Sequence, residues 1–152
     1  MTDVQLRCNQ LTEKLRQRGC RMTPQRLALI RLIAASEGHP RAADLYNAVK
    51  VQYPTMSLAT VYKIIDLLKD MDEILEINLH DVSHYDGNKP DPHPHIICTR
   101  CQKIIDGDMQ VSLSNLVREV EQNLKFKVHR HQLNFYGLCF DCQEQLASDP
   151  VK

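Results

Sequence analysis

Two pairs of cysteines in the C-terminal half are the clearest feature of this 152-residue chain that could do chemistry. Cys98 and Cys101 form one CxxC pair, and Cys139 and Cys142 form the other. Each pair can present two thiolates from a tight turn, and four thiolates make the closed tetrahedral site that structural Zn²⁺ accepts. Because 37 residues separate the pairs, the segment between them must fold back to unite them. We expect one structural zinc ion per chain; two thioredoxin-like redox pairs are the alternative.

Histidines and aspartates near the first cysteine pair indicate a second metal site. His93 and His95 are two residues apart, so in an extended segment both imidazoles point to roughly the same side and could bind one ion. Asp86 and Asp106 are close in sequence. Imidazole nitrogen together with carboxylate oxygen suits Fe²⁺, Mn²⁺ or Zn²⁺ rather than soft Cu(I). Further candidate ligands are His84, His129 and His131.

Charge divides the chain into two chemically different parts. Nineteen Lys and Arg balance nineteen Asp and Glu, which by itself argues against a simple basic nucleic-acid binder. Residues 1–70, however, carry eleven basic and six acidic side chains, whereas residues 71–152 carry eight and thirteen. All histidines except His39 lie from His80 onward. We interpret this as a basic part that could meet phosphates and an acidic part that could hold metals.

The elements that must position these residues can be predicted from apolar spacing. In the first part the spacing predicts four helices, at about residues 3–17, 24–36, 41–52 and 58–71, with Thr23 and Ser57 as N-caps. The expected buried positions are Val4, Cys8, Leu11, Leu15, Leu27, Ile30, Ile33, Leu45, Val49, Leu58, Val61, Ile65 and Leu68. Cys20 and Cys8 have no CxxC partner and are expected to be ordinary helix-face residues.

Two short alternating stretches, at residues 74–79 and 83–85, follow the fourth helix and predict a β-hairpin with a tight turn around Asp81. Helices followed by a hairpin are typical of a winged helix-turn-helix, in which the fourth helix would enter a DNA major groove. The candidate DNA-binding residues are Ser57, Thr60, Tyr62 and Lys63. The alternative is that they form the solvated face of an ordinary helical bundle.

A polar, proline-containing segment at residues 87–92 predicts a linker between residues 1–86 and residues 93–152. After it, an apolar stripe predicts a helix at residues 113–124, and the run 126–136 predicts a strand. The sequence has no apolar run near the roughly 18 residues of a membrane span and no signal-peptide pattern at its start. We therefore expect a cytoplasmic protein that does not enter a membrane.

Several segments, in order and at matching intervals over about residues 10–146, resemble the Fur family of metal-responsive bacterial repressors. They are RMTPQR at 21–26, GHP at 38–40, SLATVYK at 57–63, HPHIICTRC at 93–101 and FYGLC at 135–139. The resemblance implies an α+β fold, with an N-terminal winged helix-turn-helix followed by a small α/β dimerisation domain that holds a structural zinc. It also implies a homodimer on palindromic double-stranded operator DNA, and a regulatory metal site at the hinge between the domains.

Within the family, the resemblance is greatest to the peroxide-sensing PerR type, whose regulatory site is three His and two Asp. The matching residues are His39, Asp86, His93, His95 and Asp106, which would hold one Fe²⁺ or Mn²⁺ per subunit. Iron-sensing members more often carry Glu at both Asp positions, and zinc-sensing members often use a thiolate. The resemblance implies that peroxide oxidises His39 or His93 of the iron form, which releases DNA.

Other functions stay open at this point. They are a Fur-type iron or Zur-type zinc regulator, a small metal-dependent enzyme, and a zinc-ribbon interaction module that does not bind DNA. A further family metal site is implied to be absent, because its positions correspond to Pro94, Leu113 and His131. Arg41 stands where the family usually has a Ser or Thr helix cap, which weakens one expected cap, and Gln102 stands where Gly is common.

Overall fold

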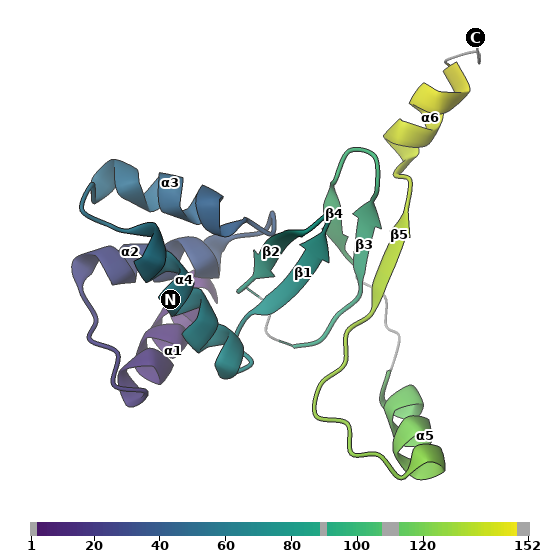
Figure 1. Cartoon of the computed structure of the whole chain (residues 1–152), viewed down its shortest axis with the longest axis horizontal. Coiled ribbons are helices and arrows are strands. Elements are labelled where there is room, and N and C mark those ends of the chain that lie inside the picture. Colours follow the sequence, from purple (N-terminus) through teal and green to yellow (C-terminus); the bar gives the residue numbers. More distant parts are fainter. Residues whose placement is uncertain (1–2, 89–90, 108–112, 149–152) are drawn as a thin grey trace. The chain divides into compact units, whose positions relative to one another are not determined.

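A computed structural model describes residues 3–88, 91–107 and 113–148 (Figure 1). The chain divides into two units, Met1–Asp91 and Pro92–Lys152, here called unit 1 and unit 2. Lys89 and Pro90 of the expected linker lie outside the described residues. No helix in the described ranges is long and apolar enough to cross a membrane.

Unit 1 contains four helices and a two-stranded hairpin (Figure 1). The elements are α1 (Asp3–Gln17), α2 (Pro24–Ala35), α3 (Ala42–Gln52), α4 (Leu58–Asp70), β1 (Leu75–Leu79) and β2 (Val82–Asp86). Thr23 and Ser57 cap α2 and α4 as predicted, because their hydroxyl oxygens accept hydrogen bonds from backbone N–H groups three residues later, at 3.4 and 3.1 Å. This arrangement confirms the winged helix-turn-helix.

The hairpin is closed by His80 and Asp81, both with positive φ (49° and 61°), as a two-residue turn of the mirror-image type requires. Antiparallel pairing runs from Leu79↔Val82 at the turn to Leu75↔Asp86 at the open end. The register therefore places Asp86 at the last residue of β2, at the open end of the hairpin.

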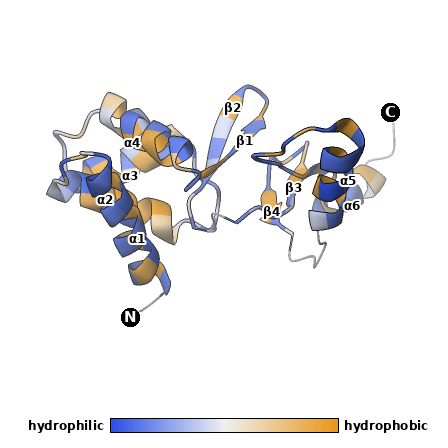
Figure 2. Cartoon of the chain, turned by 90° about the horizontal axis from the view of Figure 1, so that it is seen from below, coloured by the Kyte–Doolittle hydropathy of each residue, from blue (hydrophilic) through white to orange (hydrophobic). Residues whose placement is uncertain are grey.

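The core of unit 1 lies between the apolar faces of its helices, whose hydrophobic and hydrophilic residues alternate along each helix (Figure 2). Two residues expected inside are exposed instead: Val4 by 39% and Leu58 by 40%. Both lie in the first turn of their helix. Leu27 is only partly buried. The predicted core positions between the helix ends, from Cys8 to Leu68, are otherwise buried.

The start of α3 shows how the missing Ser or Thr cap is compensated. Arg41 occupies the N-cap, and its backbone N–H donates to the Asp44 carboxylate at 3.0 Å, which is one half of a capping box. The Arg41 guanidinium also donates to that carboxylate, at 2.7 and 2.8 Å. The hydrogen bond from Arg41 is the main cause that lowers the pKa of Asp44 to about 2. The helix end is thus stabilised by its third residue rather than by its cap.

Unit 2 is built on a three-stranded sheet with strand order β4-β3-β5. β3 pairs antiparallel with β4 and parallel with β5. The elements are β3 (His95–Cys98), β4 (Ile104–Asp106), α5 (Ser114–Leu124), β5 (Asn134–Gly137) and α6 (Phe140–Ser148). The combination of this small mixed unit with the helical unit 1 is the α+β fold expected.

The predicted strand at 126–136 is mostly wrong, because only Asn134–Gly137 forms a strand. Lys125 ends α5 in the left-handed conformation (φ 48°), and the backbone N–H of Val128 donates to the Glu121 side chain at 3.0 Å. The Val128 backbone N–H is therefore hydrogen-bonded to a side chain of α5 and not to a neighbouring strand. The apolar and β-branched residues of this run therefore gave a misleading strand signal.

The buried face of α4 can be tested by truncating Ile64, which is fully buried. We predict that Ile64→Ala lowers the free energy of unfolding by about 2–5 kcal/mol, because the change removes buried methyl groups and leaves a cavity. Urea titration followed by circular dichroism measures the change. Val51→Ala, at a site that is 85% exposed, is the control and should shift stability by no more than about 0.5 kcal/mol. Equal losses in both variants would contradict the placement of α4.

Candidate metal centres

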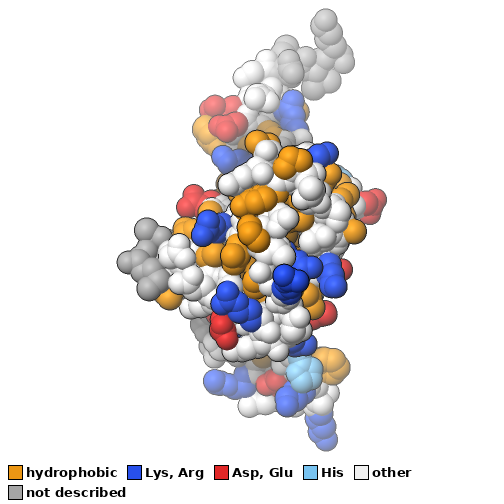
Figure 3. Space-filling model, turned by 90° about the vertical axis from the view of Figure 1, so that its left-hand side faces the viewer, with side chains coloured by type: hydrophobic (Ala, Val, Ile, Leu, Met, Phe, Trp, Pro, Cys, Tyr) orange, Lys and Arg blue, Asp and Glu red, His pale blue; other side chains and the backbone are white. Residues whose placement is uncertain are grey.

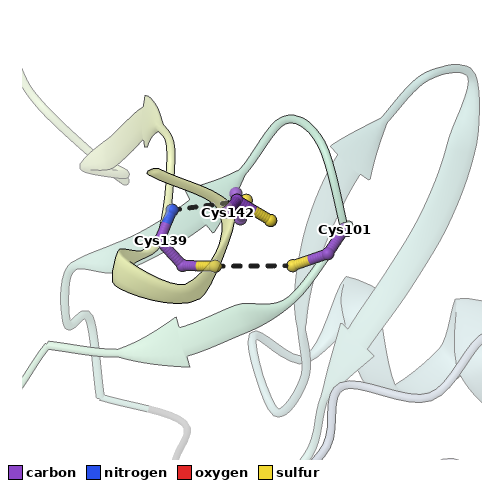
Figure 4. Close-up of side chains that lie close together, drawn as sticks. Cys101, Cys139 and Cys142 are labelled. Atoms are coloured by element: carbon purple, nitrogen blue, oxygen red, sulfur yellow. Dashed lines mark hydrogen bonds between the residues drawn. The ribbon is translucent and has the colours of Figure 1, made fainter. Parts of the chain in front are cut away.

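The four cysteines of the two CxxC pairs converge within unit 2. Their four Sγ atoms all lie within 4.8 Å of one another; the residues are Cys98, Cys101, Cys139 and Cys142. Figure 4 shows Cys101 and Cys139 with their sulfur atoms directed at one another, 3.7 Å apart. Four thiolates around Zn²⁺ at Zn–S distances of about 2.3 Å are separated by about 3.8 Å, so the cluster fits a structural zinc ion.

Parallel pairing of β3 with β5 explains how distant cysteines meet. The register aligns Cys98 with Gly137, so both CxxC turns begin where their strand ends, at the same edge of the sheet. The backbone N–H of Thr99 donates to the Gly137 carbonyl oxygen at 2.8 Å, which holds the two turns together. The long segment between the pairs supplies β4, α5 and β5, and thereby folds back as the spacing required.

The protein environment moves the pKa values of two of these thiols in opposite directions. Cys98 Sγ accepts a hydrogen bond from the Cys139 backbone N–H at 3.4 Å, and this bond is the main cause that lowers the pKa of Cys98 to about 6. Hydrogen bonding to the Cys139 side chain, followed by burial, raises the pKa of Cys142 to about 12. Because Zn²⁺ binds thiolates, zinc uptake by the cluster must displace thiol protons.

The remaining two cysteines lie apart from this cluster. Cys8 is buried on α1, as expected. Cys20 lies after the end of α1 rather than on a helix face, and its Sγ accepts a hydrogen bond from Arg26 at 3.5 Å.

Two of the predicted regulatory ligands, His39 and Asp86, meet within unit 1. His39 Nε2 lies 3.6 Å from Asp86 Oδ2, and each side chain is at most 3% exposed. His39 adopts a positive φ of 51° in the turn before α3. The backbone N–H of Tyr85 donates to the Pro40 carbonyl oxygen at 2.9 Å, and His84 Nδ1 lies 3.0 Å from the His39 carbonyl oxygen. These contacts hold the end of β2 against the His39 turn.

The other three predicted ligands, His93, His95 and Asp106, meet within unit 2. Asp106 Oδ1 lies 3.2 Å from His93 Nε2 and 3.7 Å from His95 Nε2, and the two imidazole rings are 4.5 Å apart. Antiparallel pairing of β3 with β4 places His95 directly opposite Asp106. Nitrogen and oxygen donors at these separations can share one divalent ion with bonds of about 2.0–2.2 Å.

The further histidine candidates belong to neither His/Asp set among the described residues. His129 is exposed and His131 is partly buried, while His84 contacts the backbone of His39.

The candidate DNA-binding residues lie on and before α4. Tyr62 is 45% exposed, and Lys63 is also exposed. Ser57 and Thr60 hydrogen-bond to each other through their hydroxyls at 2.8 Å, so part of their polar capacity serves the helix start. On the side where Figure 1 shows the helices of unit 1, Lys and Arg side chains lie across the surface among hydrophobic ones (Figure 3).

A winged helix-turn-helix, a four-cysteine cluster that fits structural zinc, and His and Asp side chains that could hold a metal ion are typical of a metal-dependent transcriptional regulator. The model of the ferric uptake regulator family matches residues 17–136, and the chain belongs to this family.

The chain is also similar to individual proteins of known sequence or structure. The chain is 36% identical over 132 residues to the peroxide-responsive repressor PerR of Staphylococcus aureus (strain USA300). This match covers 86% of the chain and 88% of that protein. The fold resembles that of the Helicobacter pylori ferric uptake regulator Fur, a protein with three functional metal binding sites. The TM-score is 0.73 and the sequence identity is 22%, and the match covers 92% of this chain and 93% of that chain. It also resembles a zinc-bound manganese uptake regulator, with a TM-score of 0.61 and 27% identity over 86% and 98%.

The zinc site can be tested with single substitutions. We predict that Cys142→Ser lowers the zinc content from one ion per chain to well below one after dialysis against EDTA, because a tetrahedral ligand is lost. Elemental analysis of the purified protein gives the zinc content. Cys20→Ser, outside the cluster, should retain its zinc and is the matched control. Full zinc retention by the Cys142 variant would exclude a four-thiolate site.

Proposed function

We propose that this chain is a metal-dependent repressor that releases operator DNA when peroxide oxidises a histidine ligand. The observation that carries the proposal is the ligand composition of the two His/Asp sets, three imidazoles and two aspartates. Of the described residues, no cysteine belongs to either set. The 36% identity to a peroxide-responsive repressor supports the same signal. A Fur-type iron or Zur-type zinc regulator is the second candidate, with the same zinc site and the same kind of DNA target.

We infer that all five residues ligate a single Fe²⁺ or Mn²⁺. His39 and Asp86 offer two ligands, and the three residues of unit 2 offer three, so neither set alone fills the octahedral sphere that these ions prefer. An ion that takes ligands from both units is bound fully in only one relative orientation of the units. Metal binding then favours that orientation, which is the one proposed to bind DNA. By linkage, DNA binding raises the affinity of the protein for the metal ion. In this proposal residues 1–86 bind DNA, 87–92 act as the hinge, and 93–152 dimerise.

Recognition of DNA is assigned to α4. Repressors of this family bind operator DNA as dimers, and two-fold symmetry of the protein calls for a palindromic site. Tyr62 and Lys63 face solvent and are proposed to contact the major groove, with Ser57 and Thr60 beside them at the helix N-terminus. The DNA target in turn places the protein in the cytoplasm.

A second copy of the chain would cover apolar side chains that are exposed in unit 2. They are Leu116, Leu124, Phe126, Phe135 and Tyr136, each at least 45% exposed. An apolar stripe of this kind on α5, together with aromatic residues on β5, is typical of a surface buried between subunits.

The signalling step removes one ligand. When bound, Fe²⁺ would catalyse cleavage of the peroxide O–O bond, a reaction that Mn²⁺ supports poorly. The chain holds the imidazole of His39 or His93 beside that ion, and transfer of one oxygen atom from peroxide to the ring releases water. An oxidised ring no longer donates as imidazole does, so the two units are no longer held in the DNA-binding orientation. The relatives are transcriptional regulators, and we infer that this chain, too, is a regulator and not a metal-dependent enzyme.

The role of His39 can be tested by DNA binding. We predict that His39→Ala retains zinc and a cooperative unfolding transition but weakens Mn²⁺-dependent DNA binding by more than about tenfold, because the regulatory ion loses a ligand. The probe is a duplex selected from a random pool by the Mn²⁺-loaded parent chain, and gel-shift titration gives the affinity. His80→Ala, an exposed histidine of the same unit, is the control. Metal-independent DNA binding by the parent would overturn the repressor proposal.

The signal itself can be tested by mass spectrometry. We predict that peroxide added to the Fe²⁺ form raises the mass of a peptide containing His39 or His93 by one oxygen atom and abolishes the gel shift. The Mn²⁺ form should keep both its mass and its DNA affinity. If both metal forms respond equally, the assignment moves to an iron or zinc regulator.

A further inference from the structure

A buried arginine on α1 reaches the turn that carries a regulatory ligand. Arg7 is 6% exposed, and its Nε donates to the Gly87 carbonyl oxygen at 2.9 Å. Its Nη1 donates to Glu73 Oε2 at 2.7 Å, and its Nη2 donates to the Glu73 backbone oxygen at 2.6 Å. One guanidinium thus connects three parts of unit 1: helix α1, the segment that follows α4, and the end of β2.

The Gly87 turn is confined from the opposite side as well. A Cβ built on Gly87 would overlap Ile33 Cγ2 of α2, so the backbone packs against that helix at a distance only glycine permits. The Asn88 backbone N–H donates to Asp86 Oδ1 at 3.1 Å. The turn is therefore held by Arg7, by Ile33 and by its own aspartate.

These contacts determine where the second carboxylate oxygen of Asp86 lies. With Oδ1 accepting from Asn88, Oδ2 is directed to His39 Nε2 at 3.6 Å. Rotation or displacement of the residue 86–88 turn would move Oδ2 away from this position. Ligand-orienting contacts of this kind typically contribute 10–100-fold to metal affinity.

Stability alone does not account for the arginine. A buried Arg–Glu pair loses so much hydration that apolar replacements of similar size are often neutral or stabilising. Lys14 also donates to the Glu73 carboxylate, so that group has a second cation. What only Arg7 supplies is a planar fork that reaches Glu73 and Gly87 together, which the single ammonium of a lysine cannot reproduce.

We propose that Arg7 is a positioning residue for the regulatory metal, holding the Asp86 turn through Gly87 so that the carboxylate is set for ligation. The inference rests on the proposed function, because it takes Asp86 to be a ligand of the regulatory ion. It adds α1 to the elements on which metal sensing depends. It also links the Asp86 turn to Glu73, three residues after the last residue of α4.

The experiment compares two substitutions around Glu73 in the full-length, zinc-loaded chain. Arg7→Lys keeps a cation beside Glu73 but loses the bond to Gly87, whereas Lys14→Met removes a cation from Glu73 and leaves the Gly87 bond in place. We expect Arg7→Lys to weaken Mn²⁺ binding, measured by calorimetry, by about tenfold or more, and Lys14→Met to weaken it less than about twofold. Arg7→Gln, which also lacks the fork, should behave as Arg7→Lys does.

Two further readouts separate positioning from general loss of stability. Thermal unfolding of the Mn²⁺-free proteins measures stability, and the absorption spectrum of Co²⁺ bound in place of Mn²⁺ reports the ligand set. The inference requires that Co²⁺ spectra change in the Arg7 variants and not in Lys14→Met. Unchanged Mn²⁺ affinity in Arg7→Lys would overturn the inference. A loss of Mn²⁺ affinity that is proportional to the loss of Tm in all variants would overturn it as well. If the parent chain itself binds no Mn²⁺, the regulatory site of the proposed function fails first, which is a separate and visible outcome.

Discussion

The pairing of β3 with its two neighbours places most of the metal ligands of unit 2. Its parallel register with β5 brings the two CxxC turns to one edge of the sheet, and its antiparallel register with β4 sets His95 opposite Asp106. The strand is only four residues long, with His95 at its first position and Cys98 at its last. Strand residues rise about 3.3 Å each, so the two metal sites are separated by about 10 Å of shared backbone. Zinc that fixes the Cys98 end therefore also fixes the register of the histidine end.

In unit 1 a strand and a loop bring the two candidate ligands together, because Asp86 ends β2 and His39 lies in the turn before α3. His39 and Asp86 come from segments far apart in sequence, and the bond from Tyr85 to Pro40 joins them. Backbone contacts of this kind cannot slide as an exposed side chain can. These backbone contacts bring His39 and Asp86 together within unit 1.

Much of unit 1 could be predicted from sequence because its signals are local. Helix periodicity, the Thr23 and Ser57 caps and the tight turn near Asp81 each depend on residues within a few positions. The exposure of Val4 and Leu58 shows that periodicity identifies a face but not how far a neighbouring helix covers it. The spacing of the CxxC pairs and of the HxH segment also predicted side chains that cluster in unit 2, because short spacing restricts where such residues can point.

What could not be predicted depends on residues distant in sequence. The strand expected at 126–136 shortened to Asn134–Gly137, since a strand needs a partner and no single-sequence pattern names one. Arg7 and Glu73 are 66 positions apart, and nothing in their local sequence distinguishes them from exposed charges. At the start of α3 the sequence predicted a weak helix cap, because Arg41 is an unfavourable cap residue. Asp44, three residues later, compensates by accepting a hydrogen bond from the Arg41 backbone N–H.

The apolar stripe of α5 has a consequence for how the protein behaves at different abundances. None of the eleven residues of this helix is buried within the single chain. A helix of that length is only marginally stable in water without tertiary packing, so in the homodimer proposed above its order would depend on the second copy. By mass action, the folded fraction of this part then rises with the concentration of the protein itself. In such a dimer, the cellular level of the protein would set not only how many operators are occupied but also how completely each chain is folded.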